Sequence, residues 1–114
     1  MNQCKNLRIL IYGAGVIGSL YAAYLSRSNC DVSVLARGHR LKELQEKGLF
    51  YRDGTVQKKA DVTVLDRLAP QDRYDYIFLT IRAGQLPQAL EQLKDNVSPT
   101  IITMVNSLDN YDFL

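Results

Sequence analysis

The sequence predicts one α/β domain in which helices cover both faces of a doubly wound, mainly parallel sheet. Short apolar runs alternate with stretches whose apolar residues recur at helical spacing, as in successive βαβ units. A glycine-rich turn joins the first such run to the first such stretch. The chain has 114 residues, 46% of them hydrophobic, which suffices for one domain with a substantial core but hardly for two.

The first predicted strand and helix lie on either side of the glycine turn. Residues 7–12, LRILIY, form a short apolar run that suits a strand buried on both faces of a parallel sheet. After the glycines, one helical face is predicted to point inward, with Ile17, Leu20, Tyr21, Tyr24 and Leu25. Asn29 is the expected stop of this helix, because asparagine tolerates a left-handed backbone.

The second predicted strand begins at Asp31 and reads DVSVLA. A short helix is expected over residues 40–48, since Leu41 and Leu44 share one face and Gly48 is a typical terminator. This pair repeats the strand-then-helix order of the first unit.

The stretch at residues 49–65 is of a different kind. Asp53-Gly54 is a strong tight-turn signal between strand-prone residues, so we expect a small excursion of antiparallel or edge strands. Residues 76–81 and 100–105 are apolar runs that predict the last two strands of the sheet. The helix between these two strands is expected to turn inward Leu86, Leu90, Leu93 and Val97.

The glycine turn has the pattern G-x-G-x-x-G. In this position, after the first strand and at the start of a helix, the first glycine makes the tight turn and the second lets a pyrophosphate approach the backbone. The third lets helix and strand pack closely, and the helix amides favour phosphate. We therefore predict a dinucleotide site; glycines that serve only the fold are the alternative. The predicted coenzyme-binding residues of the turn are Gly13, Ala14, Gly15, Val16, Ile17 and Gly18.

The end of the second strand favours NADP(H) over NAD. An acidic residue there would bind the ribose hydroxyls of NAD, but the sequence reads LARGHR, with Ala36 at the expected position. The guanidinium of Arg37 can hold a 2′-phosphate by two charge-assisted hydrogen bonds, whereas a carboxylate would repel it. We therefore predict NADP(H) as coenzyme, bound in part by Arg37 and Arg40, and disfavour S-adenosylmethionine. A solvated surface arginine is the alternative for both positions, most of all for Arg40.

Four blocks support a resemblance to a known family: GAGVIGSLYAAYL, VLARGHRLKELQEKGL, LTIRAGQLPQAL and ITMVNS. In their order and spacing, the sequence resembles the N-terminal domain of the ketopantoate reductase family over nearly the whole chain. The resemblance implies a Rossmann-type domain of an oxidoreductase that passes a hydride from NADPH to a 2-oxo acid such as 2-dehydropantoate, in pantothenate biosynthesis.

The resemblance also implies roles for particular residues. Arg37 matches the arginine with which the family selects NADP. Arg82 stands where the family usually has a lysine, so the charge is kept while a planar fork replaces a compact ammonium. Asn106 matches the asparagine of the family's Q-N-G block, although both neighbours differ. Arg82 and Asn106 are thereby implied as catalytic and coenzyme-binding residues near the nicotinamide ribose and the substrate.

Family members resemble two-domain enzymes whose helical C-terminal domain supplies a general-acid lysine and an acidic substrate-binding residue. We expect residues 1–114 to form a single NADP(H)-binding domain without that catalytic domain. Because a proton donor must lie within hydrogen-bond reach of the substrate carbonyl, the chain is expected to be inactive alone. A stand-alone NADP(H)-responsive binding or regulatory module without catalysis is the alternative.

Composition limits the other partners. The net charge is +2 without a run of one sign, so nucleic acid is not expected to bind. No segment approaches the roughly 18 apolar residues of a membrane span, and the start lacks a signal-peptide core, so we expect a cytoplasmic protein. No metal site is expected. Apolar surface that a second domain would otherwise cover favours self-association, so a homodimer is expected.

Overall fold

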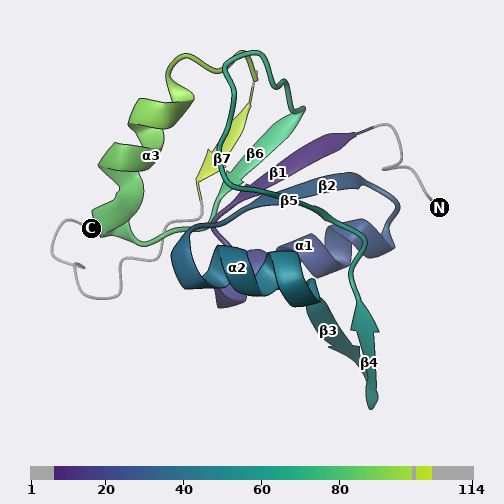
Figure 1. The fold of residues 1–114 in the computed structure, drawn as a ribbon. Coiled ribbons are helices and arrows are strands. Elements are labelled where there is room, and N and C mark those ends of the chain that lie inside the picture. Colours follow the sequence, from purple (N-terminus) through teal and green to yellow (C-terminus); the bar gives the residue numbers. More distant parts are fainter. Residues whose placement is uncertain (1–6, 99, 104–114) are drawn as a thin grey trace, which may run out of the picture.

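A computed structural model describes residues 7–98 and 100–103 (Figure 1). Its main sheet has five strands in the order β5-β2-β1-β6-β7, and every pairing is parallel. These strands are β1 (Arg8–Tyr12), β2 (Asp31–Leu35), β5 (Thr63–Leu65), β6 (Tyr76–Leu79) and β7 (Ile101–Thr103). The helices are α1 (Val16–Arg27), α2 (Gly38–Lys47) and α3 (Leu86–Leu93), with a short 3-10 turn at Ala83–Gln85. Helices α1 and α2 lie on one side of the sheet and α3 on the other, which confirms the predicted doubly wound α/β fold.

The direction of chain winding reverses between β1 and β6. From β1 the chain passes outward through α1 to β2 and through α2 to β5, and it then returns to build β6 and β7 on the other side of β1. The connections leaving the carboxyl ends of β1 and β6 therefore go to opposite faces. Such a switch point is the place where an open parallel sheet forms a ligand crevice.

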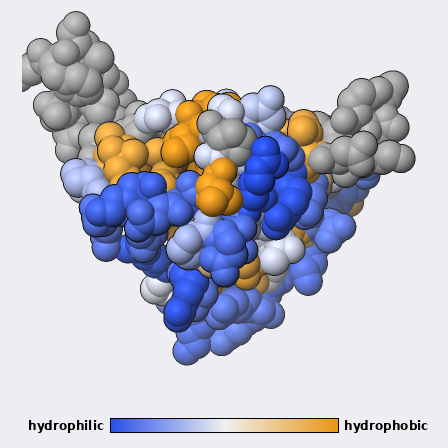
Figure 2. All heavy atoms as spheres, turned by 90° about the horizontal axis from the view of Figure 1, so that it is seen from above, coloured by the Kyte–Doolittle hydropathy of each residue, from blue (hydrophilic) through white to orange (hydrophobic). Residues whose placement is uncertain are grey.

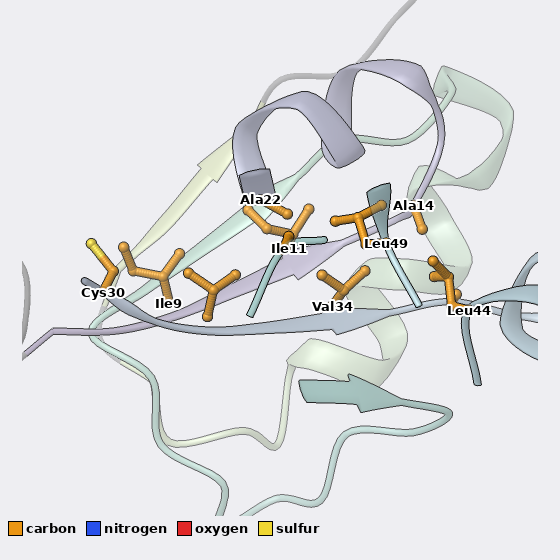
Figure 3. Packing of buried hydrophobic residues seen from close by; sticks show 11 residues of the cluster. Ile9, Ile11, Ala14, Ala22, Cys30, Val34, Leu44 and Leu49 are labelled. Carbon is orange, nitrogen blue, oxygen red and sulfur yellow. The ribbon is translucent and has the colours of Figure 1, made fainter. Parts of the chain in front are cut away.

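Two apolar clusters, one on each face of the sheet, form the core. Successive strand residues point to opposite faces. Ile9, Ile11 and Val34 belong to the cluster on the α1 side, and Figure 3 shows Ile11 beside Ala22 of that helix. Leu10 belongs to the cluster on the α3 side and is fully buried. Full burial of such a side chain contributes about 1.5 to 3 kcal/mol, so these alternating residues hold the central strands in place.

The inward face of α1 differs from the prediction. Three residues predicted to be buried are 47%, 48% and 56% exposed: Ile17, Leu20 and Tyr24. The helix instead buries Gly18 and Ala22, while Tyr21 and Leu25 are partly buried against the core. Small residues let the helix axis lie close to the sheet, and this close approach turns the larger apolar side chains outward. The helix ends as expected before Asn29, whose φ is 66°.

The structure confirms the prediction for α2 and only part of the prediction for α3. Leu44 is buried and Gly48 ends α2 with a φ of 90°, although the helix begins two residues earlier than predicted. In α3 the inward position is taken by Ala89. Leu90 is exposed and Val97 lies beyond the end of the helix, so their predicted burial is wrong. The helix is shorter than its apolar spacing indicates.

An antiparallel hairpin follows α2, as the Asp-Gly turn predicted. Its strands are β3 (Phe50–Asp53) and β4 (Val56–Lys59), and it projects away from the main sheet (Figure 1). Asp53 holds it to α1 and to itself through ion pairs with Arg27 at 3.5 Å and Lys58 at 3.1 Å. The following strand β5 then forms an edge of the main sheet.

The surface is mixed in character. The face drawn in Figure 2 is mainly hydrophilic, with hydrophobic residues gathered in a smaller part of it. Within the described ranges, none of the helices combines the length and the apolar character that a membrane span needs.

Candidate functional site

Two of the three motif glycines are required by the packing of the turn. Gly13 has a φ of +114°, and an added Cβ would lie 2.6 Å from the carbonyl oxygen of Thr80. A Cβ on Gly18 would lie 2.0 Å from the carbonyl oxygen of Gly13 and 2.6 Å from Oγ1 of Thr80. Any side chain at these positions would separate β1, α1 and β6. Their glycines are therefore explained by the fold alone.

Gly15 differs from its two neighbours in the motif. Its φ is −77°, which any residue adopts, and an added Cβ would meet no atom within 4 Å. Gly15 is the N-cap of α1, is exposed, and provides no side-chain cap. The fold therefore gives no reason for glycine here, whereas a ligand that approaches the helix N-terminus closely would require it. The first amides of a helix lack intrahelical partners and favour an anion.

Thr80 joins the two strands at the switch point. Its hydroxyl donates to the carbonyl oxygen of Gly13 at 2.9 Å and lies 3.3 Å from that of Tyr12. The Thr80 amide also donates to the Tyr12 carbonyl at 3.1 Å. No motif of the sequence points to Thr80; its only signal is that it is a polar residue at the end of an apolar run.

Arg40 contacts the glycine turn itself. Its Nε donates to the carbonyl oxygen of Ala14 at 2.8 Å, and its Nη2 donates to Oγ of Ser19 at 2.8 Å. The Ser19 hydroxyl in turn donates to the Ala14 carbonyl at 3.2 Å. Nη1 donates to Glu43 at 2.9 Å, and this hydrogen bond, together with the Arg40 charge, lowers the pKa of the Glu43 carboxyl. Each of the three guanidinium nitrogens thus has a protein partner.

Arg37 lies at the end of β2, directly before α2, and is exposed. Its Nη2 is 3.4 Å from the hydroxyl of Tyr12, to which it donates. The same hydroxyl donates to Oε1 of Gln92 on α3. Tyr12 is buried, and its hydroxyl connects the arginine to α3 on the opposite face of the sheet.

Arg82 follows β6 at the same edge of the sheet. Its side chain is exposed, and its backbone N–H donates to Oε1 of Gln85 at 3.0 Å. The other predicted catalytic residue, Asn106, lies outside the described residues.

One cavity of about 1260 Å³ brings these residues together. It extends from the glycine turn past the ends of β2 and β6 to the hairpin. Among the described residues that line it, the only acidic one is Asp53, whereas five are arginines: Arg27, Arg37, Arg40, Arg52 and Arg82. This imbalance gives the cavity a positive potential that suits a ligand with several negative charges.

Known proteins match both the sequence and the fold. The family model described as "Ketopantoate reductase PanE/ApbA" matches residues 9–114. The chain is 33% identical over 107 residues to a 2-dehydropantoate 2-reductase of Mesorhizobium japonicum, covering 90% of this chain and 32% of that protein. It is 30% identical over 105 residues to a protein of the same name from Pyrococcus horikoshii, covering 91% and 34%.

A solved structure shows the same arrangement of elements. The crystal structure of 2-dehydropantoate 2-reductase from Methylococcus capsulatus aligns with a TM-score of 0.71 and 29% identity, over 92% of this chain and 35% of that one. In each of these comparisons, the chain spans about a third of the length of the protein it matches.

Proposed function

Since the chain belongs to the ketopantoate reductase family, we propose that it is the NADP(H)-binding domain of an oxidoreductase that reduces a 2-oxo acid such as 2-dehydropantoate. The family consists of nicotinamide-dependent oxidoreductases. The choice of NADP(H) over NAD(H), the substrate and a cytoplasmic location are parts of the proposal. When bound, the coenzyme supplies the hydride.

The contrast among the motif glycines carries the proposal. Gly13 and Gly18 are required by contacts within the protein, whereas Gly15 faces open space with an ordinary backbone conformation. A pyrophosphate against this residue would accept hydrogen bonds from the exposed amides at the start of α1. The residues of the turn thus fit a dinucleotide, and they do so without any change in the packing of the turn.

Arg37 would select the phosphorylated coenzyme. It is exposed at the end of β2, the strand next to β1, and this is where a dinucleotide fold binds the ribose of the adenosine half. No carboxylate is among the described lining residues except Asp53 of the hairpin, which already pairs with Arg27 and Lys58. A guanidinium here favours a 2′-phosphate through charge-assisted hydrogen bonds.

Arg82 would act at the other half of the site. It follows β6, on the opposite side of β1 from Arg37, and it lines the same cavity. A planar guanidinium binds a carboxylate with two parallel hydrogen bonds, so Arg82 can orient the carboxylate of a 2-oxo acid or hold the nicotinamide ribose. Asn106 is proposed to assist it by hydrogen bonding.

Calorimetric titration of the chain with NADPH and with NADH tests the proposal. We expect tighter binding of NADPH, and we expect Arg37→Gln to weaken NADPH by about tenfold or more while leaving NADH unchanged, because a hydrogen bond to a charged group contributes about 1.5 to 3 kcal/mol. Arg67→Gln is the matched control, since Arg67 is 84% exposed and does not line the cavity. Equal binding of both coenzymes would refute the NADP(H) assignment, and binding of neither would refute the coenzyme site.

A further inference from the structure

We propose that Arg40 is a positioning residue that strengthens coenzyme binding by holding the glycine turn, without contacting the coenzyme. The inference rests on the proposed coenzyme site and deepens it. It changes the role predicted for Arg40 from direct binding to orientation of the peptide between Ala14 and Gly15.

The contacts of Arg40 converge on one carbonyl group. Nε of Arg40 donates to the Ala14 oxygen at 2.8 Å, and the Ser19 hydroxyl donates to the same oxygen at 3.2 Å. Nη2 of Arg40 also donates to that hydroxyl at 2.8 Å, so the three groups form a closed triangle of hydrogen bonds. Because Arg40 belongs to α2 and Ser19 to α1, two helices hold the Ala14 carbonyl in one direction.

Holding this carbonyl also orients an amide. The described peptide bonds include no cis bond, so the N–H of Gly15 points away from the Ala14 carbonyl of the same peptide unit. Gly15 is exposed, is the N-cap of α1, and lines the cavity. The arginine, which also lines the cavity, therefore orients an amide donor of the helix N-terminus through the backbone of the turn. Pre-organised donors of this kind raise affinity because binding then orders fewer groups.

Glu43 argues against a direct phosphate contact by Arg40. Its carboxylate lies 2.9 Å from Nη1 of Arg40, and the hydrogen bond and charge of the arginine lower the pKa of the Glu43 carboxyl, so the carboxylate is ionised at neutral pH. A phosphate that approached this guanidinium would meet the negative charge of Glu43 as well. Arg37, which has no acidic partner among its hydrogen bonds in the described chain, is the better phosphate ligand.

Orientation of the glycine turn and direct contact with the 2′-phosphate predict different effects of an Arg40 substitution on the binding of NADPH and NADH. The pyrophosphate is common to NADPH and NADH, whereas the 2′-phosphate occurs only in NADPH. We expect Arg40→Gln to weaken both coenzymes by the same factor, about five- to tenfold, which corresponds to about 1 to 1.4 kcal/mol. Arg37→Gln, the matched control from the residue directly before α2, should weaken the binding of NADPH alone.

Two further variants keep the test independent of folding. Ser19→Ala removes the two hydrogen bonds of the Ser19 hydroxyl and leaves the one from Nε of Arg40 to the Ala14 carbonyl. It should therefore cause a smaller loss of affinity than Arg40→Gln, and the loss should be equal for both coenzymes. Arg40→Lys should recover part of the loss, since an ammonium can donate to the Ala14 carbonyl but lacks the fork that also reaches Ser19. Urea unfolding of each variant shows whether it is folded under the titration conditions.

Three results would count against the inference or its basis. Loss of NADPH affinity alone in Arg40→Gln would mean that Arg40 contacts the 2′-phosphate, and unchanged affinity for both coenzymes would mean that the hydrogen-bonded triangle is irrelevant to binding. Either result overturns the positioning role while leaving the coenzyme site intact. No binding by the unaltered chain would instead refute the proposed function, and the inference with it.

Discussion

Gly18→Ala should destabilise the fold although alanine is the better helix former. The new Cβ would lie 2.0 Å from the Gly13 carbonyl oxygen, so an ordinary contact near 3.4 Å requires α1 to move by about 1.4 Å. The neighbour is backbone, which cannot rotate away. Overpacking of this kind costs about 3 kcal/mol, the upper part of its usual range, because the shift also opens the helix-to-sheet contact at Ala22.

Two smaller contributions to the free energy of unfolding nearly cancel. The hydroxyl of Thr80, 2.6 Å from the new Cβ, would have to leave the Gly13 carbonyl, which costs about 1 kcal/mol for a lost hydrogen bond. Alanine in place of glycine within a helix returns about 1 kcal/mol. The expected net loss is therefore about 3 kcal/mol in the free energy of unfolding, measured by urea titration with circular dichroism.

Gly15→Ala is the matched control. Its Cβ meets no atom within 4 Å, so the free energy of unfolding should change by no more than about 1 kcal/mol, the usual cost of alanine at an N-cap. The same methyl group enters the space proposed for the pyrophosphate, so coenzyme affinity should fall. A Gly18→Ala chain as stable as the Gly15→Ala chain would refute the close packing of α1 on the turn.

Two further predictions concern the switch point and the hairpin. Thr80→Val keeps the shape but removes the hydroxyl that bonds to Gly13, and it should lower the free energy of unfolding by about 1 to 2 kcal/mol in urea titration; no change would contradict the strand-joining role. The pKa of Asp53 is lowered below its ordinary 3.8 by the hydrogen bond from Lys58 and the charges of Arg27 and Lys58. Because the folded pKa is the lower one, this stabilisation is present above pH 3.8 and is lost as the pH falls through the folded pKa. Asp53→Asn should remove that part of the acid sensitivity in thermal melts across this range, and an unaltered pH profile would show that the ion pairs do not matter.

Much of the architecture was predictable because its signals are local. The glycine spacing, the apolar run before it and the Asp53-Gly54 turn each act within a few residues, and the structure confirms the strand, helix and hairpin that they indicate. The predicted inward face of α1 was wrong for a non-local reason. Periodicity identifies an apolar stripe, but the distance between helix and sheet decides whether large or small residues of the helix are buried, and Gly18 sets that distance here.

The candidate site was predictable as a set of residues and not as a set of contacts. The sequence placed the glycine turn, Arg37 and Arg82 at the ends of three different strands, and the structure brings them to one cavity. Nothing in the sequence indicated that Arg40 would bond to Ala14, 26 residues away, or that the Thr80 hydroxyl would bond to Gly13, 67 residues away.

By itself, then, the sequence determined the order of elements, the dinucleotide motif and the basic residue after the second strand, because glycine conformation, apolar alternation and charge act locally. Only the tertiary structure decided which contacts require glycine at Gly13 and Gly18. Thr80, more than 60 residues further along the chain, lies against both, and the Gly13 carbonyl also lies against Gly18, whereas an added Cβ on Gly15 meets no atom within 4 Å. The tertiary structure also decided that Arg40 faces the turn. Such contacts depend on how β1, α2 and β6 come together, and chain pairing over that separation leaves no mark in the spacing of the residues.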